Sequence, residues 1–352
     1  MVRELAPVLK QLKKNSCLLL EGAGDRSFCA GGDVASVREE AVQGNLGGLT
    51  ADFFFEEYHI DYWLSKLKQD LNVTQVSVWN GVCMGGGVGL SIHGPIRIAT
   101  EKTLFAMPEV GIGLFPDVGA TYALPRIKAG PEVGMYLALT GARLGARDCL
   151  WAGLATHYVP SDRLNALRDN LNSLGPECDA AAVNNAIESA RNGAEPPAGK
   201  GAPLDEAADV IRECFKVDSV EAILGRLMKV SESTSKHAQW AQATLKSIQV
   251  ASPLSVKLSM EALKRHGSPD VSLRHAFMIE YRMSQRAMLP QPYSDFCEGV
   301  RAVLVDKDKP KWSHSSVEQV TAAELEPYFA PLQAKHPRGE FLGDIRKVML
   351  KD

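Results

Sequence analysis

The sequence lacks any uninterrupted apolar run of about 18 residues, the minimum length for a membrane-spanning helix, so we expect no membrane partner. It also lacks an excess of charge of either sign. Its 39 Lys and Arg residues oppose 42 Asp and Glu residues, which leaves a net charge of -3. Nucleic-acid-binding surfaces usually carry a clustered basic excess. We therefore expect no nucleic-acid partner.

Paired cysteines are absent as well. The seven cysteines are odd in number and scattered, and no two of them stand in a CxxC spacing. This arrangement fits neither a zinc site nor a disulfide framework. We expect reduced thiols, an intracellular compartment and no bound metal.

Two common motifs for catalysis or nucleotide binding are missing too. No GxSxG segment marks a serine nucleophile, so Ser91 and His93 are interpreted as structural residues rather than parts of a Ser-His-Asp triad. The glycine-rich segments end neither in the Lys-Ser/Thr of a P-loop nor in a GxGxxG fingerprint. Nucleotide phosphates are therefore not the expected ligand of these segments.

The chain that remains is 352 residues long and 45% hydrophobic, enough for a full core with accessory helices. Short apolar segments alternate with glycine-marked turns and helical segments from residue 17 to about 159, which is typical of an α/β domain. We expect strands at 17–20, 73–79, 96–99 and 156–159 and helices at 51–67 and 131–139.

Helical patterns flank this part of the chain. Residues 1–14 carry Leu5, Val8, Leu9 and Leu12 at the spacing of a helix that buries one face. A targeting helix is the alternative, although Glu4 and the direct run into the first strand disfavour it.

Beyond the α/β part, the Gly- and Pro-rich residues 192–204 predict an exposed connection, and residues 205–352 a helical region. Ser252 and Pro253 form a capping pair that opens a helix to about 266, and a second helix is expected at 271–288. The charged stretch from 336 is expected to be loosely held.

Two glycine-rich segments follow expected strands, SFCAGGD at 27–33 and MGGGVG at 84–89. Small residues allow close approach of a ligand to the backbone, and free N–H groups attract negative charge. Two such segments are able to form an oxyanion hole, whereas each alone equally fits a tight turn.

A third segment, residues 105–119, carries two carboxylates, Glu109 and Asp117, among apolar, Gly and Pro residues without Lys or Arg. Carboxyls in such surroundings have raised pKa values, which suits acid/base chemistry. Taken alone, Pro-Glu and Pro-Asp also fit helix-entry caps.

In chain order, the motifs FCAGGD (28–33), MGGG (84–87), MPE (107–109) and GLFPD (113–117) resemble the signature of the crotonase superfamily, that is, the enoyl-CoA hydratase/isomerase family. The similarity continues through GARL (141–144) and AGLA (152–155). Two further segments, EYRMS (280–284) and DFCEGVRA (295–302), resemble a thioester-hydrolysing branch of the superfamily rather than its hydratases. The resemblance covers nearly the whole chain.

The resemblance implies one α/β domain over 1–352, with the ClpP-like crotonase spiral of ββα units at 1–191. Family members begin with a strand and an Asn-Arg-Pro-like segment, whereas this chain starts within the helix that follows. We therefore expect a core that lacks its usual first strand, and assign no residue to the CoA phosphates.

The resemblance also implies roles for individual residues. The main-chain N–H groups of Ala30 and Gly86 correspond to the oxyanion hole, Glu109 and Asp117 to the catalytic acids, and Glu57 to a substrate contact, although a solvated helix face is the alternative for Glu57. Hydratases of the superfamily carry a second glutamate where this chain has Gly89.

The expected activity is therefore hydrolysis of a short branched hydroxyacyl-CoA in valine breakdown, in the mitochondrion, by a homo-oligomer without cofactor. Hydration or isomerisation of an enoyl-CoA is one alternative. A structural role in the small subunit of the mitochondrial ribosome is another.

Overall fold

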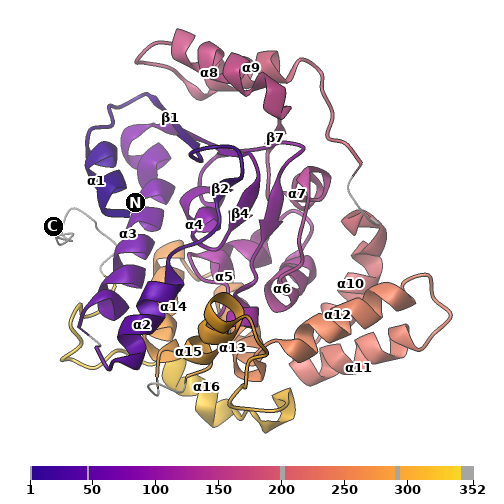
Figure 1. The fold of residues 1–352 in the computed structure, drawn as a ribbon. Coiled ribbons are helices and arrows are strands. Elements are labelled where there is room, and N and C mark those ends of the chain that lie inside the picture. Colours follow the sequence, from indigo (N-terminus) through magenta and orange to yellow (C-terminus); the bar gives the residue numbers. More distant parts are fainter. Residues whose placement is uncertain (1, 46, 199–202, 290–293, 342–352) are drawn as a thin grey trace.

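A computed structural model describes residues 2–45, 47–198, 203–289 and 294–341. Within these ranges seven strands form two parallel sheets, one with the order β1-β3-β5-β7 and one with the order β2-β4-β6 (Figure 1). The strands are Cys17–Glu21 (β1), Ser27–Cys29 (β2), Thr74–Trp79 (β3), Val82–Met84 (β4), Ile96–Ala99 (β5), Leu104–Ala106 (β6) and His157–Tyr158 (β7).

Successive strands alternate between the two sheets, and every pair is parallel. Parallel neighbours require a crossover, which helices supply here. The predicted spiral of ββα units is therefore confirmed. All residues of β3 are buried because helices and the second sheet cover both of its faces.

The four strands expected from the sequence are β1, β3, β5 and β7, which together make the larger sheet. The smaller sheet was not predicted. Its strands have three residues each, too few for a two-residue alternation of apolar and polar side chains to be recognised.

The helices surround the sheets on several sides (Figure 1). Those of the first half are Val2–Lys10 (α1), Val34–Val42 (α2), Leu49–Leu71 (α3), Gly86–Ile92 (α4), Ala120–Ala123 (α5), Pro131–Thr140 (α6), Ala146–Ala152 (α7), Leu164–Ser173 (α8) and Ala180–Arg191 (α9). Those of the second half are Ala208–Phe215 (α10), Val220–Ser231 (α11), Ala238–Val250 (α12), Pro253–His266 (α13), Leu273–Ala287 (α14), Asp295–Val300 (α15) and Ala322–Phe329 (α16).

Short turns of other helix types complete the path. They are the 3₁₀ turns Glu109–Ile112 (η1), Leu124–Arg126 (η2), Ser161–Arg163 (η3), Leu204–Ala207 (η4) and Val317–Gln319 (η6), and the π-helical Arg301–Asp306 (η5). Among the helices of the described residues, none is both long and apolar enough to cross a membrane.

Helix α3 lies at the centre of a group of packed helices. Most of its side chains are buried because α1, α4 and α14 pack around it. On α1, Ala6 and Leu9 are buried against α3, but Val8 is 52% exposed. The expectation that Val8 shares the buried face of the first helix is therefore wrong.

Both ends of the described chain are fixed to α3. Arg3 contacts Glu56 at 2.7 Å and Asp52 at 3.3 Å, while Arg338 contacts the same two carboxylates at 2.7 Å and 2.6 Å. The expectation of a loosely held end is thus wrong as far as Phe341, where the description stops. Part of the expected 192–204 connection, residues 199–202, lies outside the described residues.

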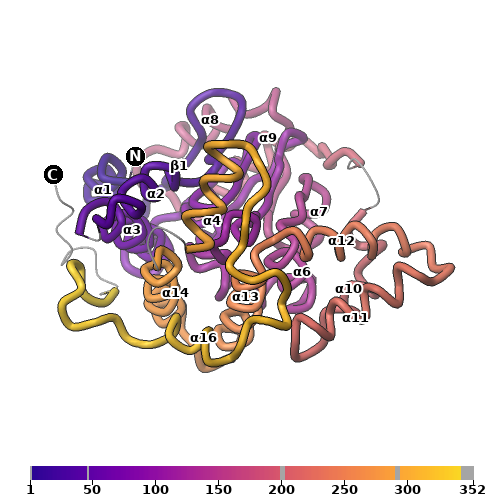
Figure 2. The backbone as a smooth tube through the Cα atoms, turned by 60° about the horizontal axis from the view of Figure 1, so that its bottom comes forward, coloured from indigo at the N-terminus to yellow at the C-terminus, as the bar shows by residue number. Residues whose placement is uncertain are grey.

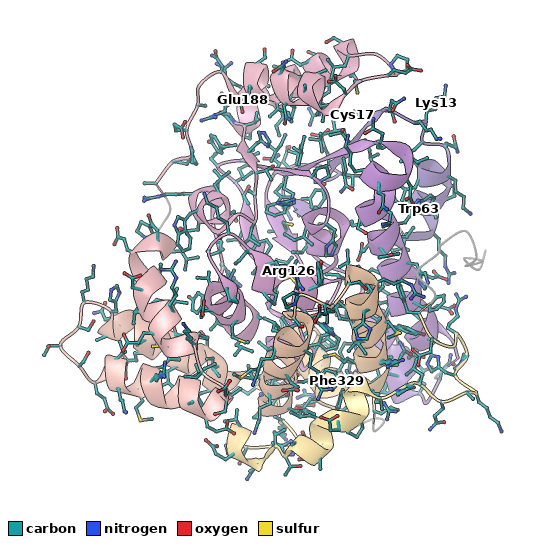
Figure 3. The ribbon with its side chains drawn as sticks, turned by 180° about the vertical axis from the view of Figure 1, so that it is seen from behind. Lys13, Cys17, Trp63, Arg126, Glu188 and Phe329 are labelled. Atoms are coloured by element: carbon teal, nitrogen blue, oxygen red, sulfur yellow. The ribbon has the colours of Figure 1, made fainter. Side chains whose placement is uncertain are left out.

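The helical second half, in which α16 lies beside α13 and α14 (Figure 2), packs against the first half at several places. Helix α15 packs against α2 (Figure 1), and Arg38 Nε donates to the carbonyl of Cys297 at 2.9 Å. Arg126, which is labelled in Figure 3, donates to the carbonyls of His266 and Ser268 at 2.7 and 2.8 Å. Ser252 caps α13, as predicted, by accepting from the N–H of Ser255.

Candidate active site

The five residues singled out in the sequence line one cavity of about 390 Å³. They come from segments that lie far apart in the chain and are Ala30, Glu57, Gly86, Glu109 and Asp117. Apolar side chains make most of the remaining wall, among them Val34, Phe53, Phe54, Ile112, Leu114, Val303 and Leu304. Acidic groups are thus held in a largely apolar cavity.

The smaller sheet brings three of the site segments together. Ala30 follows β2, Gly86 follows β4, and Glu109 follows β6 after a short link. Because these strands are parallel neighbours, their carboxyl ends meet at one edge of the sheet. The unpredicted sheet therefore positions the predicted residues.

Gly86 is the first residue of α4, so its N–H lies outside the hydrogen-bond ladder of the helix. A Cβ at this position would overlap Glu57 Oε1. Only glycine therefore lets a carboxyl group lie directly against the start of this helix. Glu57 belongs to the cavity and is 6% exposed, which excludes the solvated helix face as its setting.

Glu109 opens the turn η1 and is 5% exposed. Its Oε2 is buried and has no hydrogen-bond partner among the described residues. Burial, reinforced by the negative charge of Asp117, raises the pKa of Glu109 well above its ordinary range. This carboxyl group is therefore harder to ionise than an exposed glutamate.

Asp117 differs because it has a hydrogen-bond donor. The hydroxyl of Tyr58 donates to Asp117 Oδ2 at 2.7 Å. Burial raises the pKa of Asp117 to about 6, and the bond from Tyr58 opposes that rise. Burial and the charge of Asp117 raise the pKa of Glu57 to about 8. Asp117 thus ionises at a lower pH than Glu57.

Sequence reasoning missed two buried residues of α3 that belong to this cluster, Tyr58 and Asp61. Asp61 is fully buried, and neither of its carboxylate oxygens has a partner among the described residues. A Cβ at Gly89 would overlap Asp61 Oδ2. The spacing of Glu57 and Asp61, one helical turn apart and opposite Gly86 and Gly89, was the available signal.

Burial raises the pKa of Asp61 well above its ordinary range, and the charges of Glu57, Asp117 and Glu280 add to that rise. Glu280, on α14, joins the cluster from the other side. Within the described residues none of these carboxyls forms an ion pair, and no group of three or more His, Cys, Asp or Glu residues has the arrangement of a metal site.

Ser91 and His93 have other contacts. The Ser91 hydroxyl accepts from Trp79 Nε1 at 3.0 Å and donates to the carbonyl of Gly87 at 2.8 Å. His93 Nε2 contacts the carbonyl of Val118 at 2.9 Å. Neither residue lines the cavity, in keeping with their interpretation as structural residues.

A single basic residue, Arg143, is among the residues that line this cavity within the described ranges. It is exposed and makes no ion pair with a described residue. Arg143 belongs to the sequence motif at 141–144, from which no role for it was predicted. Its cation lies at the open side of a cavity whose interior is acidic.

Comparison with known proteins gives the same family from sequence and from structure. The chain matches a model of the enoyl-CoA hydratase/isomerase family over residues 1–329. A Danio rerio protein named 3-hydroxyisobutyryl-CoA hydrolase, mitochondrial, is 39% identical over 95% of this chain and 84% of its own length. An Arabidopsis thaliana protein named 3-hydroxyisobutyryl-CoA hydrolase 1 is 41% identical over 89% of this chain and 79% of its own.

Two solved structures are similar over most of their length. An enoyl-CoA hydratase from Rhodobacter sphaeroides has a TM-score of 0.77 and 32% identity, covering 94% of this chain and 90% of its own. A carnitinyl-CoA dehydratase from Mycobacterium thermoresistibile has a TM-score of 0.79 and 33% identity, covering 96% and 90%. The whole described architecture, helical second half included, thus has counterparts.

The buried carboxyl of Asp61 makes a prediction about stability. Folding raises the pKa of Asp61, so the folded state favours the protonated carboxyl. The stability that this group contributes is therefore fully present at low pH. It is lost as the pH rises from the ordinary pKa of an aspartate toward the pKa in the folded protein. Asp61→Asn has no carboxyl group to ionise at this position, so it should not lose stability in this way. Between pH 5 and pH 8 we expect the variant to gain free energy of unfolding relative to the parent, by at most about 1.4 kcal/mol per pH unit.

Urea denaturation at both pH values measures this change. Asp70→Asn, an exposed acid on the same helix, is the control. Equal pH dependence of the two variants would contradict a raised pKa for Asp61.

Proposed function

This chain belongs to the enoyl-CoA hydratase/isomerase family, and on that basis we propose that it hydrolyses 3-hydroxyisobutyryl-CoA to 3-hydroxyisobutyrate and coenzyme A, a step of valine breakdown. The observation that carries the proposal is the single cavity shared by Ala30, Gly86, Glu109 and Asp117. The names of relatives 39% and 41% identical to this chain supply the substrate.

The main-chain N–H groups of Ala30 and Gly86 are the proposed donors to the thioester oxygen. Negative charge develops on that oxygen when water or a carboxylate adds to the carbonyl carbon. Fixed donors stabilise it, by about 3 kcal/mol for each donor in comparable sites. Because the donors are main-chain groups, side-chain changes act on them only by moving the backbone.

Glu109 is the proposed catalytic acid/base. Either it takes a proton from the attacking water, or its carboxylate adds to the thioester and water cleaves the resulting anhydride. In both routes the carbon–sulfur bond breaks and the CoA sulfur leaves with a proton. Single-turnover hydrolysis in heavy-oxygen water separates them, because label enters Glu109 only through the anhydride.

Asp117 and Glu57 are the proposed contacts to the substrate hydroxyl and the water. Asp117 is ionised at neutral pH and accepts a hydrogen bond, whereas protonated Glu57 is able to donate one. The two acids thereby distinguish an acyl group with a hydroxyl from one without it, since an unpaired buried carboxyl is costly.

Hydration of an enoyl-CoA is the second candidate, because both similar solved structures are named as a hydratase or a dehydratase. Gly89 supplies no side chain for a second acid. Asp61 occupies the adjacent space but is fully buried and does not line the cavity. The available acids therefore favour hydrolysis.

The remaining features of the proposal follow from the reaction and the relatives. Transfer of an acyl group to water changes no oxidation state, so we propose that no redox cofactor takes part. Because the carboxyls of the cavity supply the acid/base groups, the proposed mechanism uses no metal. The location we propose is the mitochondrion, after the names of the animal relatives. We propose a homo-oligomer as the working form.

The proposed activity predicts release of free thiol from 3-hydroxyisobutyryl-CoA and little hydration of crotonyl-CoA, both followed with the purified full chain. Glu109→Gln and Asp117→Asn, which keep shape but remove the acid, are expected to lower kcat by about 10²- to 10⁴-fold. Asp70→Asn is the matched control and should keep kcat. Turnover of crotonyl-CoA alone, or unchanged turnover in both amide variants, would overturn the proposal.

The position of Arg143 predicts how the nucleotide part of coenzyme A is bound. The cation at the cavity mouth suits the CoA phosphates, so Arg143→Ala should raise KM about tenfold, as expected for loss of a charged hydrogen bond, and leave kcat nearly unchanged. Arg143→Lys should lie between the two.

The matching pantetheine thioester, which lacks the nucleotide phosphates, supplies the test of that contact. With this substrate Arg143→Ala should have no effect on KM. Arg163→Ala, at an exposed position outside the cavity, is the control. An equal increase of KM for both substrates would assign Arg143 another role.

A further inference from the structure

The backbone that follows Asp117 is strained. Val118 has a φ of 54°, a region that β-branched residues rarely adopt. Such a conformation persists only where the surroundings over-determine it, and it often lies beside functional groups. The contacts that hold it therefore bear on the position of the Asp117 carboxylate.

Glu280 supplies most of these contacts from α14. Its Oε2 accepts from the N–H of Gly119 at 2.6 Å, and its Oε1 accepts from the N–H of Thr121 at 3.1 Å. The hydroxyl of Thr121 donates to the same Oε1. On the other side of the strained residue, His93 Nε2 contacts the carbonyl of Val118 at 2.9 Å.

The arrangement is buried and closed. Glu280 and Thr121 are both 0% exposed. Since the Thr121 hydroxyl gives its proton to Glu280, His266 Nδ1, 2.7 Å away, donates to Thr121. Burial lowers the pKa of His266 to about 3, so this histidine stays neutral. Burial raises the pKa of Glu280 to about 8, and no cation among the described residues pairs with it. Its hydrogen bonds go to Gly119 and Thr121 of the loop.

The chemistry of the contact selects a glutamate. Each of its two carboxylate oxygens accepts from a different main-chain N–H, and these lie on residues 119 and 121. A glutamine has one acceptor oxygen, so its NH₂ group would face one of those N–H groups. An aspartate on the same helix would be one methylene shorter.

We propose that Glu280 is a positioning residue for Asp117, because its carboxylate holds the strained backbone at Val118 and so directs the Asp117 side chain toward Tyr58 and the cavity. The inference deepens the proposed function and rests on the role given there to Asp117. It also gives the helical second half a part in the site, since Glu280 of α14 lies 161 residues beyond Gly119 in the chain.

Glu280→Gln tests the proposal in two backgrounds. In the parent protein the substitution should lower kcat on the order of 100-fold, the effect of a catalytic group displaced by about 1 Å, with KM within about twofold. In the Asp117→Asn background the same substitution should lower the residual kcat by less than about threefold, because the group that it positions is already gone.

This double-mutant cycle separates an effect on the position of Asp117 from general damage to the fold. If Glu280→Gln lowers kcat equally in both backgrounds, Glu280 acts on the fold as a whole and the inference fails alone. If Asp117→Asn keeps the parent kcat, the proposed role of Asp117 fails, and the inference fails with it.

A second pair of variants covers the case in which Glu280→Gln does not fold. Thr121→Val removes one donor to Glu280 and should lower kcat about tenfold, again only when Asp117 is present. Thr121→Ser keeps the hydroxyl and should restore kcat. Asp148→Asn is the matched control and should keep kcat. Asp148 also accepts a main-chain N–H from a residue distant in sequence, that of Leu204 at 2.9 Å, but it does not line the cavity.

Discussion

The packing of α3 against the glycine face of α4 is the constraint on which the site depends. Gly86 and Gly89 leave room between the helices, and the carboxyls of Glu57 and Asp61 occupy it. A side chain at either glycine would expel a carboxyl group from the interface. Burying these acids without a cation costs stability, since every buried charge must be neutralised or paired. Burial raises the pKa values of both carboxyls instead.

The buried acids do not all have the same surroundings. Asp117 receives a hydrogen bond from Tyr58, whereas Glu109 has an oxygen without a partner. The bond from Tyr58 opposes the rise in the pKa of Asp117, and no side-chain hydrogen bond opposes the rise at Glu109. Two acids with the same surroundings would not differ in this way.

The same region shows how separate parts of the chain meet in one site. The short strands of the smaller sheet bring the glycine segments and Glu109 to one edge, α3 brings Glu57 and Tyr58, and α14 brings Glu280 to the loop after Asp117. The helical second half is therefore more than a cover for the spiral, because one of its side chains reaches the backbone beside a candidate catalytic acid.

The sequence by itself determined the larger sheet and the capped helix α13, because apolar periodicity and a Ser-Pro cap are local along the chain. The order of short motifs, through the family resemblance, identified five residues that line the cavity. The sequence did not determine the smaller sheet, whose strands are too short to show a period. Nor did it indicate Tyr58, Asp61 or Glu280. Their roles arise from contacts across 59 to 161 residues of chain and from the space beside glycines, and only tertiary packing decides which distant groups meet and how much water is excluded around them.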